Sequence, residues 1–343
     1  MSTDDNTQAA VPVAIQIIRA GKLNSVQDAG RSGFRHLGIC QAGALDNVAL
    51  SIANRLVGNV IDTAALEITM GPCVLRFATD TRIALGGADF AATLDDKPLA
   101  PWWSVQVRAG QTLTLNAARH GMRAYVAIAG GINVPKQLGS CSTDIQAGFG
   151  GHQGRPLQND DQLVTGAAID AIGQETQRLH AVPNFGVRPP GWYQNSDDDV
   201  VQIRVIPGPE YALFTAAAQK AFWSSQWTLT SQSNRMGFRL SGPELKTKKA
   251  VDLLSHGVLP GVIQVPPSGQ PIVLMADAQT TGGYPKIGVV IQADLARLAQ
   301  CRFNRTLQFV TCSIEQARQE LNNDTLFLEQ IAQAMTWLRP TNK

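Results

Sequence analysis

The chain has 343 residues, which exceeds one typical domain and makes two domains the expectation. Its formal net charge of +2 gives no electrostatic reason to expect nucleic acid or an acidic membrane as a partner. The hydrophobic content of 44% is that of a globular protein with a sizeable core.

Residues 1–12 are largely polar, and we predict a disordered tail there. They lack the basic and apolar regions of a signal peptide, and no apolar run reaches the roughly 18 residues of a membrane span. The five cysteines have no paired metal-ligand spacing, which favours free thiols and predicts no metal site. Together these features predict a cytoplasmic protein.

The first candidate site is the loop at 25–34, which places Gln27, Asp28 and Arg31 among glycines. Arg31 could bind a carboxylate or phosphate through two parallel hydrogen bonds while Asp28 orients its guanidinium. A structural Asp–Arg pair that fixes a turn explains the same residues equally well.

The next stretch predicts one helix followed by β-structure. Residues 46–56 carry an apolar stripe at helical spacing that ends before Gly58. Beyond Gly58, short apolar or alternating runs are separated by turn residues, a pattern typical of a β-sandwich or barrel. The predicted strands are 74–77, 82–85, 91–94, 104–107, 112–115 and 123–128.

A second candidate site lies in the glycine-rich segment 129–155, where Ser140, His152 and Arg155 would suit an anion or a developing oxyanion. The glycines lack the G-x-G-x-x-G spacing and βαβ context of a dinucleotide-binding loop. The chain also has no Walker A motif and no G-x-S-x-G motif.

Residues 181–199 are rich in Pro, Gly, Asn and Asp and predict a linker between two domains. The pattern R-x-G-F-R occurs once on each side, at 31–35 and 235–239, which suggests two related β-domains with equivalent arginine loops. Further helices are predicted at 210–223, at 293–300 and from Ser313, whose hydroxyl could form a capping box with Gln316.

The third candidate site follows an apolar strand at 272–275, where polar side chains and two glycines succeed one another closely. An ordinary β-turn is the alternative, but the density of hydrogen-bonding groups favours a binding site. The polar residues of this segment are Gln264, Asp277, Gln279, Thr280, Thr281, Tyr284 and Lys286.

With these motifs in order, the chain resembles the biotin-dependent carboxyltransferase-like family, also called the allophanate hydrolase subunit 2-like family. The resemblance extends from about residue 17 to residue 314. It rests on the ordered blocks at 25–31, 43–46, 53–59, 66–67, 130–132, 138–140, 150–157, 233–237 and 277–286.

The resemblance implies a mainly β protein of two cyclophilin-like β-barrel domains with a few short helices. The first domain would span 13–194, and the second would span 195–343 and include a C-terminal helix. A cleft between the domains would carry the function.

Within the family the blocks match the 5-oxoprolinase branch best. This match implies an ATP-dependent complex that opens the lactam of 5-oxoproline (pyroglutamate) to give L-glutamate. The chain would be active only together with the B component of that complex, which is Kip-type inhibitor-like, and the A component. Which component binds ATP stays open, and no metal is implied.

A lactam is resonance-stabilised, so its opening requires carbonyl activation and charge stabilisation. We expect arginines to hold carboxylate or phosphate charge, an aspartate to orient groups or accept a proton, and Lys286 to stabilise charge. The candidate catalytic residues are Asp28, Arg155, Arg235, Asp277 and Lys286. The candidate substrate-binding residues are Gln27, Arg31, Ser140, Asn234, Gln264, Gln279, Thr280, Thr281 and Tyr284.

Three alternatives remain open. A carboxyltransferase would move a carboxyl group from carboxybiotin to urea or another amide, with the biotinylated and ATP-binding parts on partner proteins. A Kip-type regulatory protein would bind a kinase-inhibitor partner without catalysis. A free-standing amidase has the least support, because the sequence shows no catalytic triad or metal pattern.

Overall fold

The computed structural model describes residues 14–166, 182–194 and 200–337. The predicted tail at 1–12 and the residues 195–199 at the predicted domain boundary lie outside the described residues. In the described ranges, every helix is too short or too polar to cross a membrane.

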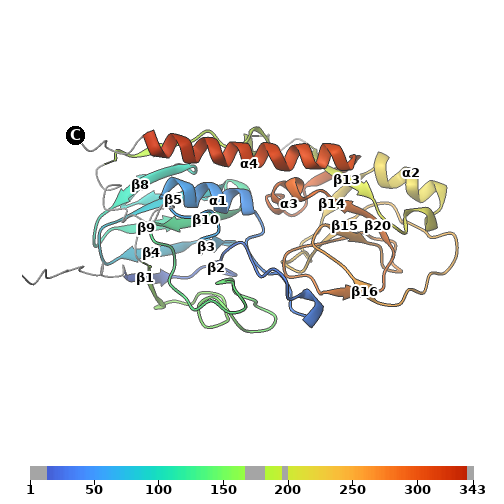
Figure 1. Ribbon diagram of the computed structural model, residues 1–343, viewed down its shortest axis with the longest axis horizontal. Helices are drawn as coiled ribbons and strands as arrows, with labels where there is room; N and C mark the ends of the chain where they lie inside the picture. Colours follow the sequence, from blue (N-terminus) through green and yellow to red (C-terminus); the bar gives the residue numbers. More distant parts are fainter. Residues whose placement is uncertain (1–13, 167–181, 195–199, 338–343) are drawn as a thin grey trace, which may run out of the picture.

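Two six-stranded sheets form the N-terminal half, residues 14–194 (Figure 1). The first has the order β11-β1-β4-β9-β6-β7 and the second the order β12-β8-β5-β10-β3-β2. Their bounds are β1 Ala14–Arg19, β2 Ser25–Gln27, β3 Ala65–Ile68, β4 Cys73–Phe77, β5 Thr81–Asp89, β6 Thr93–Leu94, β7 Lys97–Pro98, β8 Trp103–Val107, β9 Thr112–Leu115, β10 His120–Ile128, β11 Gln162–Val164 and β12 Phe185–Gly186.

Both sheets contribute to one hydrophobic core. In β4, Cys73, Leu75 and Phe77 are buried while Arg76 between them is exposed, as the period-2 alternation of a strand requires. The same core cluster contains Ile83 of β5 from the opposite sheet. The strand predictions of this region are therefore confirmed, although the run at 91–94 pairs only over β6.

The outer face of the second sheet is covered by helix α1, Asn47–Leu56. Asp46 caps this helix, because its Oδ1 accepts a hydrogen bond from the backbone N–H of Ala49 at 2.9 Å. Ile52 and Leu56, which belong to the predicted apolar stripe, are buried. The helix lies where the sequence predicts it.

The C-terminal half begins with a closed seven-stranded barrel in the order β13-β20-β17-β18-β15-β14-β21. Its first and last strands pair in parallel, which closes the ladder. A two-stranded sheet of β16 and β19 lies beside it. The bounds are β13 Val201–Pro207, β14 Gln226–Leu229, β15 Gly237–Ser241, β16 His256–Gly257, β17 Val262–Gln264, β18 Ile272–Leu274, β19 Thr281–Gly282, β20 Lys286–Val290 and β21 Thr306–Thr311.

The remaining helices are α2 Ala216–Ser224, α3 Gln292–Ala299 and α4 Ile314–Trp337. Helix α2 starts later than predicted, because 211–213 form a separate 3-10 turn and Thr215 caps the helix. Ser313 and Gln316 form the predicted capping box with reciprocal hydrogen bonds of 2.9 and 3.2 Å. Helix α4 then runs along both halves and contacts α1 and α3 (Figure 1).

The mainly β fold with a barrel and a few helices is thus confirmed. The predicted linker has structure in its described part, since β12 pairs with β8 and the Tyr193 hydroxyl donates to Asp46 Oδ2 at 2.6 Å. Helix α4 packs Ile331 and Met335 into the α1 cluster of the N-terminal half. The domain division at residue 195 stays a prediction.

Candidate functional site

The Asp28 carboxylate is a buried hydrogen-bond acceptor between two loops of the N-terminal half. It accepts hydrogen bonds from the hydroxyls of Ser140 at 2.6 Å and Ser142 at 2.5 Å. The backbone N–H groups of Gly30 and Cys141 also donate to it, at 2.8 and 2.5 Å. These bonds fix the loop at 25–34 against residues 140–142, and the catalytic role of Asp28 stays a prediction.

Arg31 lies beside this carboxylate and is only 1% exposed. Its Nη2 donates to the carbonyl of Ser142, and its guanidinium carbon lies 4.4 Å from the centre of the Phe149 ring. Its Nε and Nη1 have no hydrogen-bond partner. Burial lowers the pKa of Arg31, although the nearby carboxylates of Asp144 and Asp28 oppose that shift. Unpartnered guanidinium donors in a buried position are suited to an oxygen-bearing ligand.

The segment 38–44 connects this loop to the barrel. Cys40 Sγ donates to Asp144 Oδ2 at 3.1 Å, and the backbone N–H of Ala42 donates to the carbonyl of Ala276 at 3.1 Å. Burial raises the pKa of the Cys40 thiol to about 12, and the hydrogen bond to Asp144 is the second largest cause of this shift. Cys40 is therefore a protonated thiol at neutral pH and a poor nucleophile.

A buried charge network joins the two halves. It consists of Glu67 and Arg123 with Tyr125 from the N-terminal half, and Arg235 and Asp277 from the barrel; we call it the junction network. Arg235 forms a bidentate pair with Asp277 at 2.8 and 2.9 Å and donates from Nη1 to Glu67 at 2.5 Å. It also donates to the carbonyl of Gly43 at 2.5 Å. The guanidinium is therefore engaged by protein groups on all sides.

Glu67 is the centre of the junction network. It is completely buried, and its Oε2 accepts hydrogen bonds from the Tyr125 hydroxyl at 2.7 Å and the backbone of Leu45 at 3.0 Å. Burial alone would raise the pKa of Glu67, but Arg235 and Arg123 lower it below its ordinary value. Burial would likewise lower the pKa of Arg235, but Asp277 and Glu67 raise it. Both groups are therefore charged at neutral pH.

On the barrel, Lys286 and Gln264 lie opposite each other on paired strands. Lys286 Nζ lies 2.9 Å from Glu210 Oε2, and both side chains are largely buried. Gln264 is 2% exposed, and its Nε2 has no hydrogen-bond partner. A Cβ on Gly282 would come within 2.5 Å of that Nε2, so a larger residue at position 282 would require the Gln264 side chain to shift.

The remaining predicted residues of the barrel lie at its surface. Asn234 Oδ1 accepts hydrogen bonds from the backbone of Met236 at 2.9 Å and so closes a local turn. Thr280 and Thr281 line a groove of about 640 Å³, and Tyr284 lines a groove of about 820 Å³. Gln279 is exposed, and its carbonyl accepts a hydrogen bond from Arg35 at 3.0 Å.

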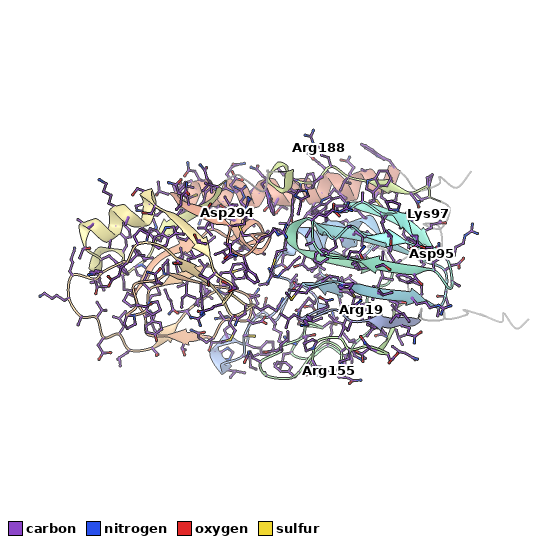
Figure 2. All side chains as sticks on the ribbon, turned by 180° about the vertical axis from the view of Figure 1, so that it is seen from behind. Arg19, Asp95, Lys97, Arg155, Arg188 and Asp294 are labelled. Atoms are coloured by element: carbon purple, nitrogen blue, oxygen red, sulfur yellow. The ribbon has the colours of Figure 1, made fainter. Side chains whose placement is uncertain are left out.

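Arg155 lies apart from these groups, in loops on the side of the molecule opposite helix α4 (Figure 2). It forms a bidentate pair with Asp161 at 2.7 and 2.8 Å and also donates to Gln153 and to the carbonyl of Pro156. His152 lies 3.4 Å from the same carboxylate. The arginine closes a surface loop here, and its catalytic role stays a prediction.

The structure thus brings two groups of predicted residues together. Asp28, Arg31 and Ser140 share one loop cluster with Gln27, whose Nε2 donates to the carbonyl of Thr143 at 3.2 Å, and Arg235 pairs with Asp277 at the junction. Two further acidic residues lie with these groups: Glu67 contacts Arg235, and Asp144 lies near Arg31. The sequence alone did not lead us to predict either one as a site residue. Glu67 had a usable signal, because it is a charged residue in the otherwise apolar, fully buried strand 65–68.

Among the described residues, no group of three or more His, Cys, Asp or Glu side chains is arranged to hold a metal ion. Cys40, Cys73, Cys141, Cys301 and Cys312 are all free.

Comparison with known proteins agrees with this architecture. Residues 37–311 match the family described as carboxyltransferase domain, subdomain A and B. The chain belongs to this carboxyltransferase-domain family. Two similar curated proteins are the C component of 5-oxoprolinase from Escherichia coli (strain K12), 48% identical, and that from Haemophilus influenzae, 42% identical. The matches cover 93% and 92% of this chain, respectively, and 97% of each relative.

A solved structure is also similar to this chain. The urea amidolyase of K. lactis superposes with a TM-score of 0.83 at 28% identity over 94% of this chain. The matched part is 20% of that longer protein. The same mainly β architecture therefore occurs in short chains of this length and inside a longer enzyme.

Proposed function

We propose that this chain is the C component of a multi-protein, ATP-dependent 5-oxoprolinase that opens the lactam of 5-oxoproline to L-glutamate in the cytoplasm. The observation that carries this proposal is the 48% identity to the C component of E. coli 5-oxoprolinase, because it extends over 97% of that protein. The partners would be the A and B components, and ATP would be used by the assembled complex.

The loop cluster of Gln27, Asp28, Arg31 and Ser140, which we call the Arg31 cluster, offers hydrogen-bond donors suited to such a substrate. 5-Oxoproline carries a carboxylate and an amide carbonyl, and both are acceptors for guanidinium N–H groups. Arg31 offers the unpartnered Nε and Nη1, whereas Arg235 and Arg155 already donate to protein carboxylates. We therefore assign substrate anchoring to Arg31 and keep Arg235 as the group that positions Asp277.

Barrel residues would complete the site. Lys286, next to Glu210, could stabilise charge that develops on the lactam oxygen during activation by phosphate. Asp277 is held by the bidentate pair with Arg235 and could orient a water molecule or accept a proton. Gln264, with its unpartnered Nε2, could donate to the substrate carbonyl.

Reconstitution tests the proposal. The chain would be co-expressed with the A and B components of the same organism, and 5-oxoproline-dependent ATP hydrolysis and glutamate release would be measured with each component omitted in turn. We expect both activities to require this chain. If the three components assemble but turnover is equally fast when this chain is omitted, the catalytic role is excluded and a Kip-type regulatory protein is favoured.

The similarity to the K. lactis urea amidolyase supports a second candidate, carboxyl transfer from carboxybiotin to a urea-like amide. The chain would then depend on biotin carboxylase and biotin carrier partners. Adding those partners with urea to the purified chain and measuring urea-dependent ATP hydrolysis separates the two functions. Activity with urea and none with 5-oxoproline would replace the first proposal by the second.

A further inference from the structure

Three aspartates lie near the Arg31 guanidinium, and they differ in how fully their oxygens are used. Burial lowers the pKa of Arg31, and the charges of Asp144, Asp28 and Asp277 oppose that shift, which places the three carboxylates close to it. Asp28 already accepts four hydrogen bonds from its own loops. Asp277 is occupied by its bidentate pair with Arg235. Asp144 is therefore the one of the three that has capacity for a further donor.

The two oxygens of Asp144 have different partners. Oδ1 accepts hydrogen bonds from the backbone N–H groups of Gln146 at 3.1 Å and Ala147 at 2.9 Å. Within the described part of the chain, Oδ2 accepts a hydrogen bond from the Cys40 thiol alone, at 3.1 Å. A thiol is a weak donor. Because Asp144 is only 3% exposed, its Oδ2 is a buried charged oxygen that could accept a stronger N–H donor.

Arg31 and Asp144 are held close together without bonding to each other. The guanidinium carbon of Arg31 lies 4.4 Å from the centre of the Phe149 ring, and the backbones of Phe149 and Asp144 exchange hydrogen bonds of 2.9 and 3.3 Å. The Arg31 Nη2 donates to the carbonyl of Ser142, while Nε and Nη1 have no hydrogen-bond partner. Unused donors and an acceptor with remaining capacity therefore lie on neighbouring groups.

We propose that Asp144 Oδ2 accepts the N–H of the substrate amide while Arg31 binds an oxygen-bearing group next to it, so that Asp144 selects lactams over compounds without an N–H. This assignment rests on the proposed 5-oxoprolinase function. The nitrogen of 5-oxoproline is bonded both to the carbonyl carbon and to the carbon that carries the carboxylate. Its N–H therefore lies beside whichever of these groups Arg31 binds. An analogue that lacks the N–H would leave the buried acceptor unpaired and would be rejected.

Gln27 Oε1 is a second acceptor of the Arg31 cluster without a hydrogen-bond partner. The Gln27 side chain is completely buried, and its Nε2 donates to Ser25 Oγ at 2.9 Å and to the carbonyl of Thr143 at 3.2 Å. An N–H bonds to a carboxylate about twice as strongly as to a neutral oxygen. We therefore assign the substrate N–H to Asp144, and experiment can separate the two acceptors.

Binding of two ring compounds tests the assignment: 5-oxoproline, and the corresponding lactone, in which oxygen replaces the ring N–H. Their dissociation constants for the chain assembled with its A and B components are measured by calorimetry without ATP. In parallel, 5-oxoproline-dependent ATP hydrolysis is measured with the same preparation. We expect the wild type to bind the lactam about tenfold more tightly than the lactone, or better.

Asp144→Asn should remove this preference. The backbone N–H groups that bind Oδ1 would keep the Asn oxygen on their side, so the NH2 group would take the place of Oδ2 and face the substrate N–H. We expect the affinity for 5-oxoproline to fall about tenfold or more, and the affinity for the lactone to change less than about threefold. A purely structural role of Asp144 would weaken the binding of both compounds alike, and that result would overturn the assignment.

Two variants serve as controls. Cys40→Ala removes the thiol hydrogen bond and keeps the Asp144 carboxylate, and Asp96→Asn changes an exposed aspartate. Both should keep the wild-type preference for the lactam.

The outcomes separate the assignment from the proposed function. A wild-type complex that hydrolyses 5-oxoproline but does not prefer the lactam, or keeps its preference after Asp144→Asn, would overturn the assignment alone. A preference that persists in Asp144→Asn would favour Gln27 as the acceptor. A wild-type complex that binds neither compound would overturn the assignment together with the proposed function.

Discussion

At the scale of single residues, three arginines that look alike in sequence have different surroundings. Arg235 is engaged by Asp277, by Glu67 and by a backbone carbonyl, while Arg155 closes a loop with Asp161. Arg31 keeps unpartnered donors. The Glu67 partner of Arg235 is 168 residues away in the chain, so no local pattern could predict it. The residue types of the site were predictable, but the availability of their hydrogen-bonding groups was not.

Removal of the Glu67 charge should destabilise the protein strongly. Glu67→Gln leaves Arg235 and Arg123 with an uncompensated positive charge in a buried place, and we expect a loss of about 3–5 kcal/mol in the free energy of unfolding. Urea denaturation measures this loss. The control is Glu320→Gln, which breaks a partly exposed pair with Arg204 and should cost about 1 kcal/mol or less. Equal losses in the two variants would contradict the central place of Glu67.

Asp46 should make stability depend on pH in the direction opposite to ordinary acid denaturation. Burial raises the pKa of Asp46 to about 6, so the folded state binds this proton more tightly than the unfolded state. The stability contributed by protonation is present at low pH and is lost as the pH rises from about 4 to about 6. The difference in unfolding free energy between wild type and Asp46→Asn should therefore fall by up to about 1.4 kcal/mol per pH unit in that window. A difference that stays constant across these pH values would show that Asp46 does not titrate there.

At the scale of elements, most of the correct predictions came from the alternation of apolar and polar residues in strands and from helix-capping residues. The period-2 pattern located the strands of the N-terminal half, and the Ser313–Gln316 box located the start of α4. The length of α4 and its packing on α1 had no local signal, because its buried residues are few and lie near its end. The contacts of the described part of the predicted linker had no local signal either, because Tyr193 donates to Asp46, a residue far away in the sequence.

The end of α4 should stabilise the N-terminal half. Ile331→Ala removes a side chain that is 4% exposed and packed in the α1 cluster, and we expect a loss of about 2–4 kcal/mol in the free energy of unfolding. Leu326→Ala on the same helix is the matched control, since Leu326 is 53% exposed and should cost less than about 1 kcal/mol. Thermal denaturation of both variants measures the difference. Indistinguishable midpoints would mean that the end of α4 does not stabilise the N-terminal half.

At the scale of the whole molecule, the two halves meet through charges. Glu67 from one half and Asp277 from the other share Arg235, and the contact between Ala42 and Ala276 brings the Arg31 loop to the same place. The sequence predicted a mainly β protein with a cleft between domains through its family resemblance, and the family assignment is confirmed. Composition and motifs do not show how the two halves are placed relative to each other. They therefore could not predict which residues contact one another across the junction.

We propose above that Arg31 anchors the substrate of a lactam-opening complex. The most direct measurement is 5-oxoproline-dependent ATP hydrolysis by the complex reconstituted with its A and B components, comparing wild type with Arg31→Gln and with the exposed control Arg108→Gln. We expect Arg31→Gln to lower kcat/KM about 100-fold in an intact complex, while Arg108→Gln retains wild-type activity. Wild-type kcat/KM in a correctly assembled Arg31→Gln complex would exclude Arg31 as the substrate anchor.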